Sequence, residues 1–127
     1  MELEPGLIAK VKLTVTEADT AQTLGSGDVP VLGTPRVLAL VEAATVRATA
    51  RYLPSGTTTV GTRVELEHLV ATPVGGTVTA EARLDRVDGR RLAFTVTVHD
   101  GDRLAARGTV ERALVDRERF LARALAS

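Results

Sequence analysis

The stretch Val37-Leu38-Ala39-Leu40-Val41-Glu42-Ala43-Ala44-Thr45-Val46 decides how the rest of the chain can be arranged. Nine of its ten residues are apolar or nearly so, and the tenth is Glu42. Apolar residues on most sides of a helix predict that the helix is buried. A carboxylate at the centre of such a helix has to be paired, take up a proton, or face a cavity. Glu42 is therefore the first candidate for a functional residue.

The predicted helix runs from about Pro35 to Leu53. Thr34 is a good N-cap, and proline suits the first helical position because its missing N–H would have no partner there. The sequence 54–56, Pro-Ser-Gly, is typical of a helix end. A regular helix places Thr34 roughly 12 Å from Glu42. If Thr34 does more than cap the helix, the two side chains act on different atoms of one substrate or meet across a dimer.

The segments around this helix alternate between apolar and polar residues, which is typical of half-buried strands. One such segment, residues 7–15, precedes the helix, and four more lie between residues 57 and 115, joined by turns such as Asp88-Gly89. One face of the first of these four is expected to carry Val60, Thr62, Val64, Leu66 and His68.

Two connecting segments have patterns of their own. Residues 16–30 contain Gly25, Gly27 and Pro30 and have no periodicity, which predicts a loop and a candidate flap over a site. Asp116 is expected to cap a short closing helix. This closing helix is expected to extend over Phe120, Leu121 and Leu125.

The predicted order is a strand, a long helix, four strands joined by tight turns, and a short helix. Consecutive hairpins imply an antiparallel sheet. An α+β arrangement in which a curved antiparallel sheet of about five strands wraps a long central helix is the hotdog fold. Few other arrangements bury a helix that is apolar on most sides. The length of 127 residues predicts a single domain, residues 1–127.

The composition excludes several classes of function. Sixteen basic and sixteen acidic residues cancel, so no excess of positive charge indicates nucleic-acid binding. The absence of cysteine excludes disulfides, zinc–thiolate sites and thiol nucleophiles. No segment approaches the roughly 20 apolar residues of a membrane span, and residues 1–15 lack the pattern of a signal peptide. We expect a cytoplasmic protein with no nucleic-acid, membrane or metal partner.

Three further residues are candidates, each with a structural alternative. His68 is either a satisfied core residue or a neutral proton relay near pH 7. Gly61 either forms a bulge and relieves crowding, or lets the backbone approach a ligand closely. Arg112 either lies on a solvated face or is the partner of a buried acid or a phosphate. The residues alone leave these alternatives open, and they also leave open whether Glu42 merely pairs with an arginine at a subunit boundary.

With these residues identified, the sequence resembles the fluoroacetyl-CoA thioesterase family of hotdog proteins. The matching stretches are Val31–Pro35 and on through Glu42 to Leu53, Thr59–Gly61, His68–Gly75, Val87–Leu92, Val98–Gly101, Gly108-Thr109 and Glu111-Arg112. They cover most of residues 31–120, whereas residues 1–30 match poorly.

The resemblance implies a role for each candidate. The family's catalytic threonine, glutamate and histidine fall on Thr34, Glu42 and His68, with the same intervals of eight and 26 residues. The family's glycine, whose amide helps hold the substrate, falls on Gly61, and an arginine near the site falls on Arg112. The implied function is an acyl-CoA thioesterase that hydrolyses a small acyl thioester, with coenzyme A as part of the substrate and no other cofactor.

A homodimer is also expected, because one small sheet cannot cover a helix that is apolar on nearly every side. A non-catalytic acyl-CoA binding protein is the alternative from another class, although pure binding has no need of a buried acid. A hotdog hydratase is a second rival, but the aspartate–histidine pattern of those enzymes is absent. The fluoroacetyl-specific member carries phenylalanines in its flap, whereas residues 16–33 contain no aromatic residue, and Val110 stands where the family often has histidine. We therefore expect an open, aliphatic acyl site with a weak preference for fluoroacetyl groups.

Overall fold

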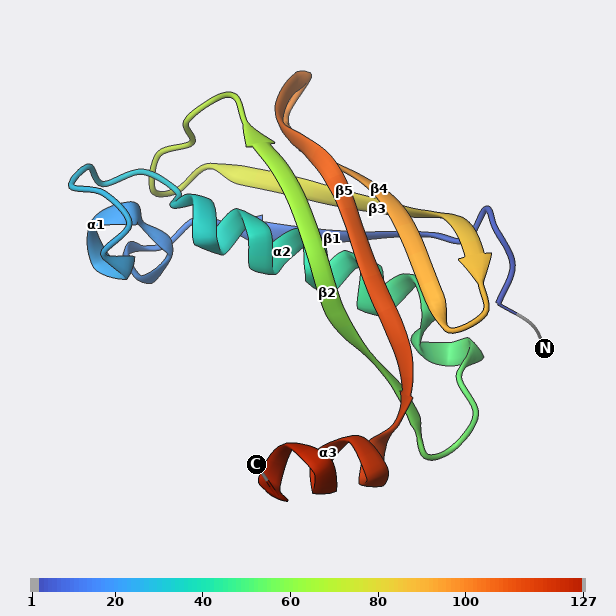
Figure 1. The fold of residues 1–127 in the computed structure, drawn as a ribbon. Coiled ribbons are helices and arrows are strands. Elements are labelled where there is room, and N and C mark those ends of the chain that lie inside the picture. Colours follow the sequence, from blue (N-terminus) through green and yellow to red (C-terminus); the bar gives the residue numbers. More distant parts are fainter. Residues whose placement is uncertain (1–2, 127) are drawn as a thin grey trace.

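A long helix, α2 (Thr34–Thr49), lies along one face of a five-stranded sheet that curves around it (Figure 1). The computed structural model describes residues 3–126, so residues 1–2 and 127 of the predicted domain lie outside it. The strands are β1 (Ile8–Thr14), β2 (Thr57–His68), β3 (Thr77–Asp88), β4 (Arg91–Asp100) and β5 (Arg103–Asp116). Their order in the sheet is β1-β3-β4-β5-β2, with every neighbouring pair antiparallel. The predicted hotdog fold is confirmed.

The core lies between α2 and the central strands. Strict alternation along β3 and β4 turns every second side chain toward the helix, where those side chains are fully or almost fully buried. On the two strands these are Val78, Ala80, Ala82, Leu84, Leu92, Phe94, Val96 and Val98. They pack against Val37, Leu40, Val41 and Ala44 of α2. Each buried Val, Leu or Phe side chain stabilises the fold by about 1.5–3 kcal/mol, so the core fixes where α2 and its polar residues lie.

The ends of α2 differ from the prediction. The α-helix ends at Thr49, and a 3₁₀ turn, η2 (Ala50–Tyr52), continues to the predicted end near Leu53. The N-cap is Gly33, so the prediction of Thr34 as the cap is wrong. Close packing explains the glycine, because a Cβ at Gly33 would lie 3.0 Å from the backbone of Ala21. The Thr34 hydroxyl is therefore not used in capping.

Residues 16–30 are more ordered than the predicted loop. They contain a 3₁₀ turn, η1 (Glu17–Asp19), and a single helical turn, α1 (Ala21–Leu24). The Asp19 carboxylate accepts hydrogen bonds from the Thr16 amide at 2.8 Å and from Arg36 Nε of α2 at 3.0 Å. Short turns made by polar caps carry no apolar periodicity, so the sequence pattern could not reveal them. The contact with Arg36 holds this segment against the start of α2.

Strand β2 contains a bulge that changes which residues face the helix. The pairing with β5 shifts between Gly61 and Arg63, leaving Thr62 as the extra residue. An inserted residue inverts the alternation. Thr59 and Gly61 face α2 before the bulge, as their contacts with Arg112 and Glu42 show. Beyond the bulge the half-buried residues are Val64, Leu66 and His68. The predicted common face is therefore wrong for Val60 and Thr62.

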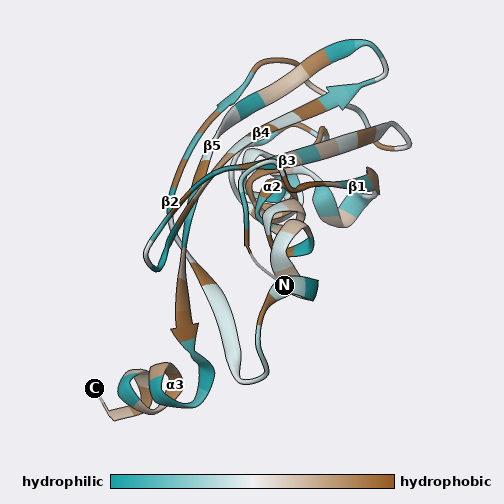
Figure 2. Ribbon diagram, turned by 90° about the vertical axis from the view of Figure 1, so that its right-hand side faces the viewer, coloured by the Kyte–Doolittle hydropathy of each residue, from teal (hydrophilic) through white to brown (hydrophobic). Residues whose placement is uncertain are grey.

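The last helix, α3 (Arg117–Ala126), is present and is capped as predicted, with Asp116 Oδ1 accepting from the Arg119 amide at 2.9 Å. However, α3 stands apart from the sheet and α2, and none of its residues is buried (Figures 1 and 2). The apolar residues of α3 are accordingly exposed: Phe120 by 43%, Leu121 by 55% and Leu125 by 77%. No helix of the described residues is both long and apolar enough to cross a membrane.

Candidate active site

The predicted site residues form two separate groups in one chain. The first is the hydroxyl–imidazole pair, Thr34 and His68, in which Thr34 Oγ1 lies 2.8 Å from His68 Nδ1. Thr34 begins α2 and His68 ends β2, so the packing of helix on sheet brings them together. Because Gly33 provides the cap, the Thr34 hydroxyl is available for the imidazole. In the tautomer with its proton on Nε2, His68 accepts this hydrogen bond.

Burial changes the acidity of His68. Loss of solvent lowers the pKa of its imidazole below the ordinary value of 6.5, and a hydrogen bond with the Val70 backbone acts in the opposite direction. The neutral ring therefore predominates at pH 7. In a neutral imidazole, one ring nitrogen donates a hydrogen bond and the other accepts one. A neutral imidazole bonded to a hydroxyl is able to take up and return a proton.

A pocket of about 290 Å³ adjoins this pair. Its walls come from the segment 21–34 and from residues 68–71 at the end of β2. Among its described lining residues, Ser26, Thr34 and His68 carry polar side chains, and the others are glycine or aliphatic. None of these described lining residues is Phe, Tyr or Trp. The predicted flap therefore does border the site, and its wall is aliphatic, as its composition indicated.

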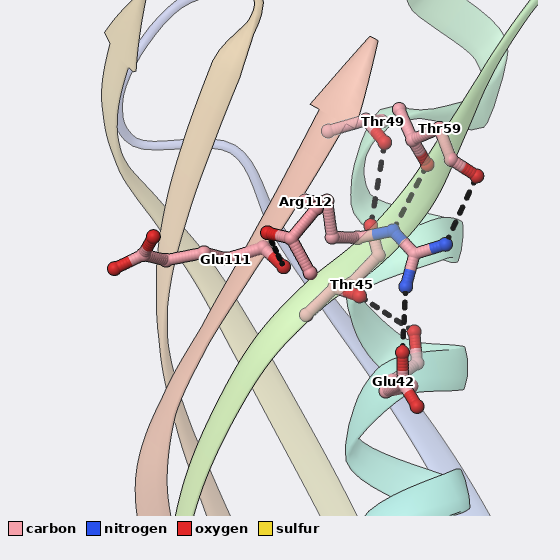
Figure 3. A network of polar contacts seen from close by, with 7 residues as sticks. Glu42, Thr45, Thr49, Thr59, Glu111 and Arg112 are labelled. Carbon is pink, nitrogen blue, oxygen red and sulfur yellow. Dashed lines mark hydrogen bonds and ion pairs between the residues drawn. The ribbon is translucent and has the colours of Figure 1, made fainter. Parts of the chain in front are cut away.

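The second group is the carboxylate cluster, which consists of Glu42, Thr59, Gly61 and Arg112. Figure 3 shows Glu42, Thr59 and Arg112 of this cluster. Arg112 Nη1 donates to Glu42 Oε2 at 3.1 Å, with 8% of the arginine side chain and 31% of the glutamate side chain exposed. Burial lowers the pKa of the Arg112 guanidinium, and the Glu42 charge opposes that shift. Glu42 is thus held as an ion pair by a neighbour in its own chain.

The glycine at position 61 has a steric cause. A Cβ at Gly61 would overlap the Glu42 carboxylate, so a side chain here would push that carboxylate away from β2. The two structural alternatives for Gly61, a bulge and relief of crowding, are both observed. Arg112 is only 7% exposed, so the solvated-face interpretation is wrong and its pairing with a partly buried acid is confirmed.

Among residues 3–126, no hydrogen bond or ion pair connects the two groups. Thr34 meets His68, and Glu42 meets Arg112 and Gly61, but Glu42 does not contact the imidazole in the same chain. The Glu42 Oε1 atom has no hydrogen-bond partner in the described part of the chain. The same residues include no cluster of three or more His, Asp or Glu side chains suited to a metal ion. Thr59, which sequence reasoning missed, is signalled only by its position two residues before Gly61.

Two comparisons of the sequence with known proteins indicate the same family. The model of the fluoroacetyl-CoA-specific thioesterase family matches residues 15–118. A fluoroacetyl-CoA thioesterase of Streptantibioticus cattleyicolor is 44% identical over 93 residues, which are 73% of this chain and 67% of that protein.

Solved structures extend the likeness to the whole described chain. The structure of the fluoroacetyl-CoA thioesterase FlK is 34% identical and superposes with a TM-score of 0.93 over 100% of this chain and 98% of that one. A threonine-to-serine variant of FlK in complex with acetyl-CoA gives a TM-score of 0.92 at 34% identity, covering 98% of each chain. A thioesterase-superfamily protein of Thermus thermophilus is 24% identical with a TM-score of 0.88, over 95% of this chain and 90% of that one, and supports the fold alone.

Proposed function

Because the chain belongs to the fluoroacetyl-CoA-specific thioesterase family and is an acyl-CoA thioesterase, we propose that Thr34, Glu42 and His68 carry out the hydrolysis. The observation that carries this assignment is the state of Glu42: one carboxylate oxygen is held by Arg112, and the other has no partner in the described chain. The Glu42 side chain is 31% exposed, so this second oxygen can be reached from solvent. Here one oxygen is left for a substrate or a water molecule.

Glu42 would act through Oε1 in one of two ways. It attacks the thioester carbonyl carbon, the C–S bond breaks, and the thiolate of coenzyme A leaves while an acyl anhydride forms on Glu42; water then releases the acid and restores the carboxylate. Alternatively, the carboxylate removes a proton from water, and the resulting hydroxide attacks the same carbon. Both routes consume one water and yield one carboxylic acid and one thiol.

His68 would supply the protons. Its lowered pKa keeps the ring neutral at pH 7, so it can accept a proton from water and pass one to the leaving thiolate. Thr34 would hold the imidazole in one orientation through their 2.8 Å contact and position the acyl group beside the pocket. The Gly61 amide is proposed to help polarise the carbonyl. Substrate binding by Arg112 stays a prediction.

We further propose a homodimer in which Glu42 of one protomer faces the hydroxyl–imidazole pair of the other. Three observations support this arrangement. Ala39, Ala43 and Val46 form an exposed apolar stripe on α2, which Ala50 at the start of η2 continues. Strand β2 lies at an edge of the sheet, and α3 exposes its apolar residues. A second copy would cover these surfaces and bring together two groups that are separate in one chain.

The pocket suggests the kind of acyl group. Its volume of about 290 Å³ and aliphatic walls suit a short or medium unbranched acyl chain better than acetyl alone. We propose that the chain acts as a single domain, residues 1–127, in the cytoplasm, where coenzyme A thioesters are found. Release of free thiol from a panel of acyl-CoA thioesters tests the function. Steady turnover is expected, whereas stoichiometric binding without thiol release would favour the acyl-CoA binding alternative.

A further inference from the structure

The Arg112 guanidinium is oriented by one residue outside the predicted site. Its Nε donates to Thr59 Oγ1 at 2.9 Å, and its Nη2 donates to the Thr59 carbonyl oxygen at 3.1 Å. The third hydrogen bond, from Nη1, goes to Glu42 Oε2 at 3.1 Å. Figure 3 shows the guanidinium lying between Thr59 on β2 and Glu42 on α2. Two of its three nitrogens are thus fixed by Thr59.

This arrangement links Thr59 to Glu42 without any contact between them. A buried guanidinium needs several acceptors, because a charged group without hydrogen bonds is costly away from water. A guanidinium is also planar and rigid, so two bonds to one residue fix the direction in which its remaining nitrogen points. That nitrogen holds Oε2, which restricts the directions in which the carboxylate can present Oε1.

The bulge in β2 is what makes this possible. Thr59 and Gly61 face α2 before it, and His68 faces the same side after it. In a regular strand, residues 59 and 61 would lie on the face opposite residue 68, because side chains alternate with a period of two. The extra residue Thr62 allows a single strand to serve both groups, the carboxylate cluster and the hydroxyl–imidazole pair.

We propose that Thr59 is a positioning residue for the thioesterase reaction, acting through Arg112 to set the orientation of the Glu42 carboxylate. This inference rests on the proposed function of Glu42. It also gives Arg112 a role toward the carboxylate, beside the predicted role in substrate binding, since three of its five N–H donors are engaged by the protein. The Thr59 hydroxyl touches no reacting atom and changes the rate only through the geometry of its neighbour.

The test compares three variants on acetyl-CoA. Thr59→Val keeps the shape but removes the acceptor of Nε, Thr59→Ser keeps the acceptor, and Thr58→Val is the matched control on the opposite side of the strand. We expect Thr59→Val to lower kcat by roughly tenfold or more with KM within about twofold of the wild type, because misdirected reacting groups lose rate rather than binding. Thr59→Ser and Thr58→Val should both retain kcat within about twofold.

A second measurement separates positioning from loss of structure. The Nε–H of Arg112 should give an NMR signal protected from exchange with water, which Arg112→Lys identifies by its disappearance. Thr59→Val should expose this proton and Thr59→Ser should keep it protected. Thr59→Val is expected to lower the melting temperature, because a buried donor loses its acceptor, and a cooperative unfolding transition above the assay temperature shows that the variant is folded. If Thr59→Val fails to fold, Thr59→Ala replaces it in both measurements.

The outcomes are distinguishable. A wild-type protein that hydrolyses no acyl-CoA overturns the proposed function and this inference with it. An active wild type whose folded Thr59→Val or Thr59→Ala variant keeps full kcat overturns this inference alone. A loss of kcat that Thr59→Ser shares to the same extent also overturns it, because the hydroxyl acceptor would then not be the cause.

Discussion

The Glu42–Arg112 pair joins α2 to β5 and the Thr34–His68 pair joins α2 to β2, but the protein holds the two pairs very differently. Arg112 is 7% exposed and has three hydrogen bonds that fix it between a strand and the helix. Thr34 is exposed, and its 2.8 Å contact with His68 lies beside an open pocket. The charged group is anchored by burial, and the neutral pair is placed where a substrate can reach it.

This difference indicates a division of roles. A nucleophile or base has to be held in one direction, which needs fixed partners and little freedom. A proton relay has to exchange protons with water and with a leaving group, which needs access. The same helix, α2, contributes a residue to both pairs, at different points along its length. Its apolar neighbours fix its position, and they thereby fix the position of both pairs.

The largest effect is expected from removing either reacting group. Glu42→Gln and His68→Ala should each lower kcat for an acyl-CoA substrate by roughly three orders of magnitude, because each role is essential to the same step. The double variant should lose little more than either single one, since groups that act as a unit are not additive. Steady-state thiol release gives the rates, and circular dichroism checks the fold. Near-normal turnover of folded Glu42→Gln would refute the assignment of the carboxylate.

A smaller effect is expected from crowding the anchored group. Gly61→Ala places a Cβ against the Glu42 carboxylate and should destabilise the fold by about 1–3 kcal/mol, as overpacking generally does, while also lowering kcat. Thermal unfolding measures the stability. The control is the same substitution in a Glu42→Ala background, where Gly61→Ala should cost much less stability than it does in the wild type because the clash is gone. If Gly61→Ala costs as much in both backgrounds, the glycine is needed for another reason.

The smallest effect is expected for the discrimination between acyl groups in the pocket beside Thr34 and His68. Fluoroacetyl-CoA differs from acetyl-CoA by one small substituent, and an apolar pocket discriminates such a change by only about 1–3 kcal/mol. The pocket wall contains glycine and aliphatic residues and no aromatic plug, so we expect kcat/KM for the two thioesters to differ by much less than a thousandfold. Side-by-side kinetics decide this. A preference of about a thousandfold or more would mean that residues 25–30 close over the substrate.

The sequence predicted the framework of this site because apolar periodicity reports which face is buried. The pattern in α2, β3 and β4 gave the helix, the antiparallel sheet and the hotdog layout. The sequence did not predict the positions at which a single residue decides which side chains of a strand face the helix, or which residue caps a helix. The bulge at Thr62 inverts the first half of β2, and Gly33 rather than Thr34 caps the helix.

Polar contacts between distant segments were equally out of reach. The Thr59–Arg112 bonds join residues 53 positions apart, and no local pattern reports such a pair. The sequence did not predict where α3 lies. Its apolar residues indicate that it packs against an apolar surface, but they do not identify that surface. The spacing of Thr34, Glu42 and His68 therefore identified candidates, while their division into two groups came from the structure.

The most direct test of this division is a hybrid dimer. One protomer carries Glu42→Gln and the other carries His68→Ala, and the hybrid is purified through two different affinity tags after co-expression. If each site combines Glu42 of one protomer with Thr34 and His68 of the other, one of the two sites is intact, and the hybrid should have about half the wild-type kcat per dimer. If each site lies within one chain, both sites carry a defect, and activity no higher than that of the two parent variants would contradict the account.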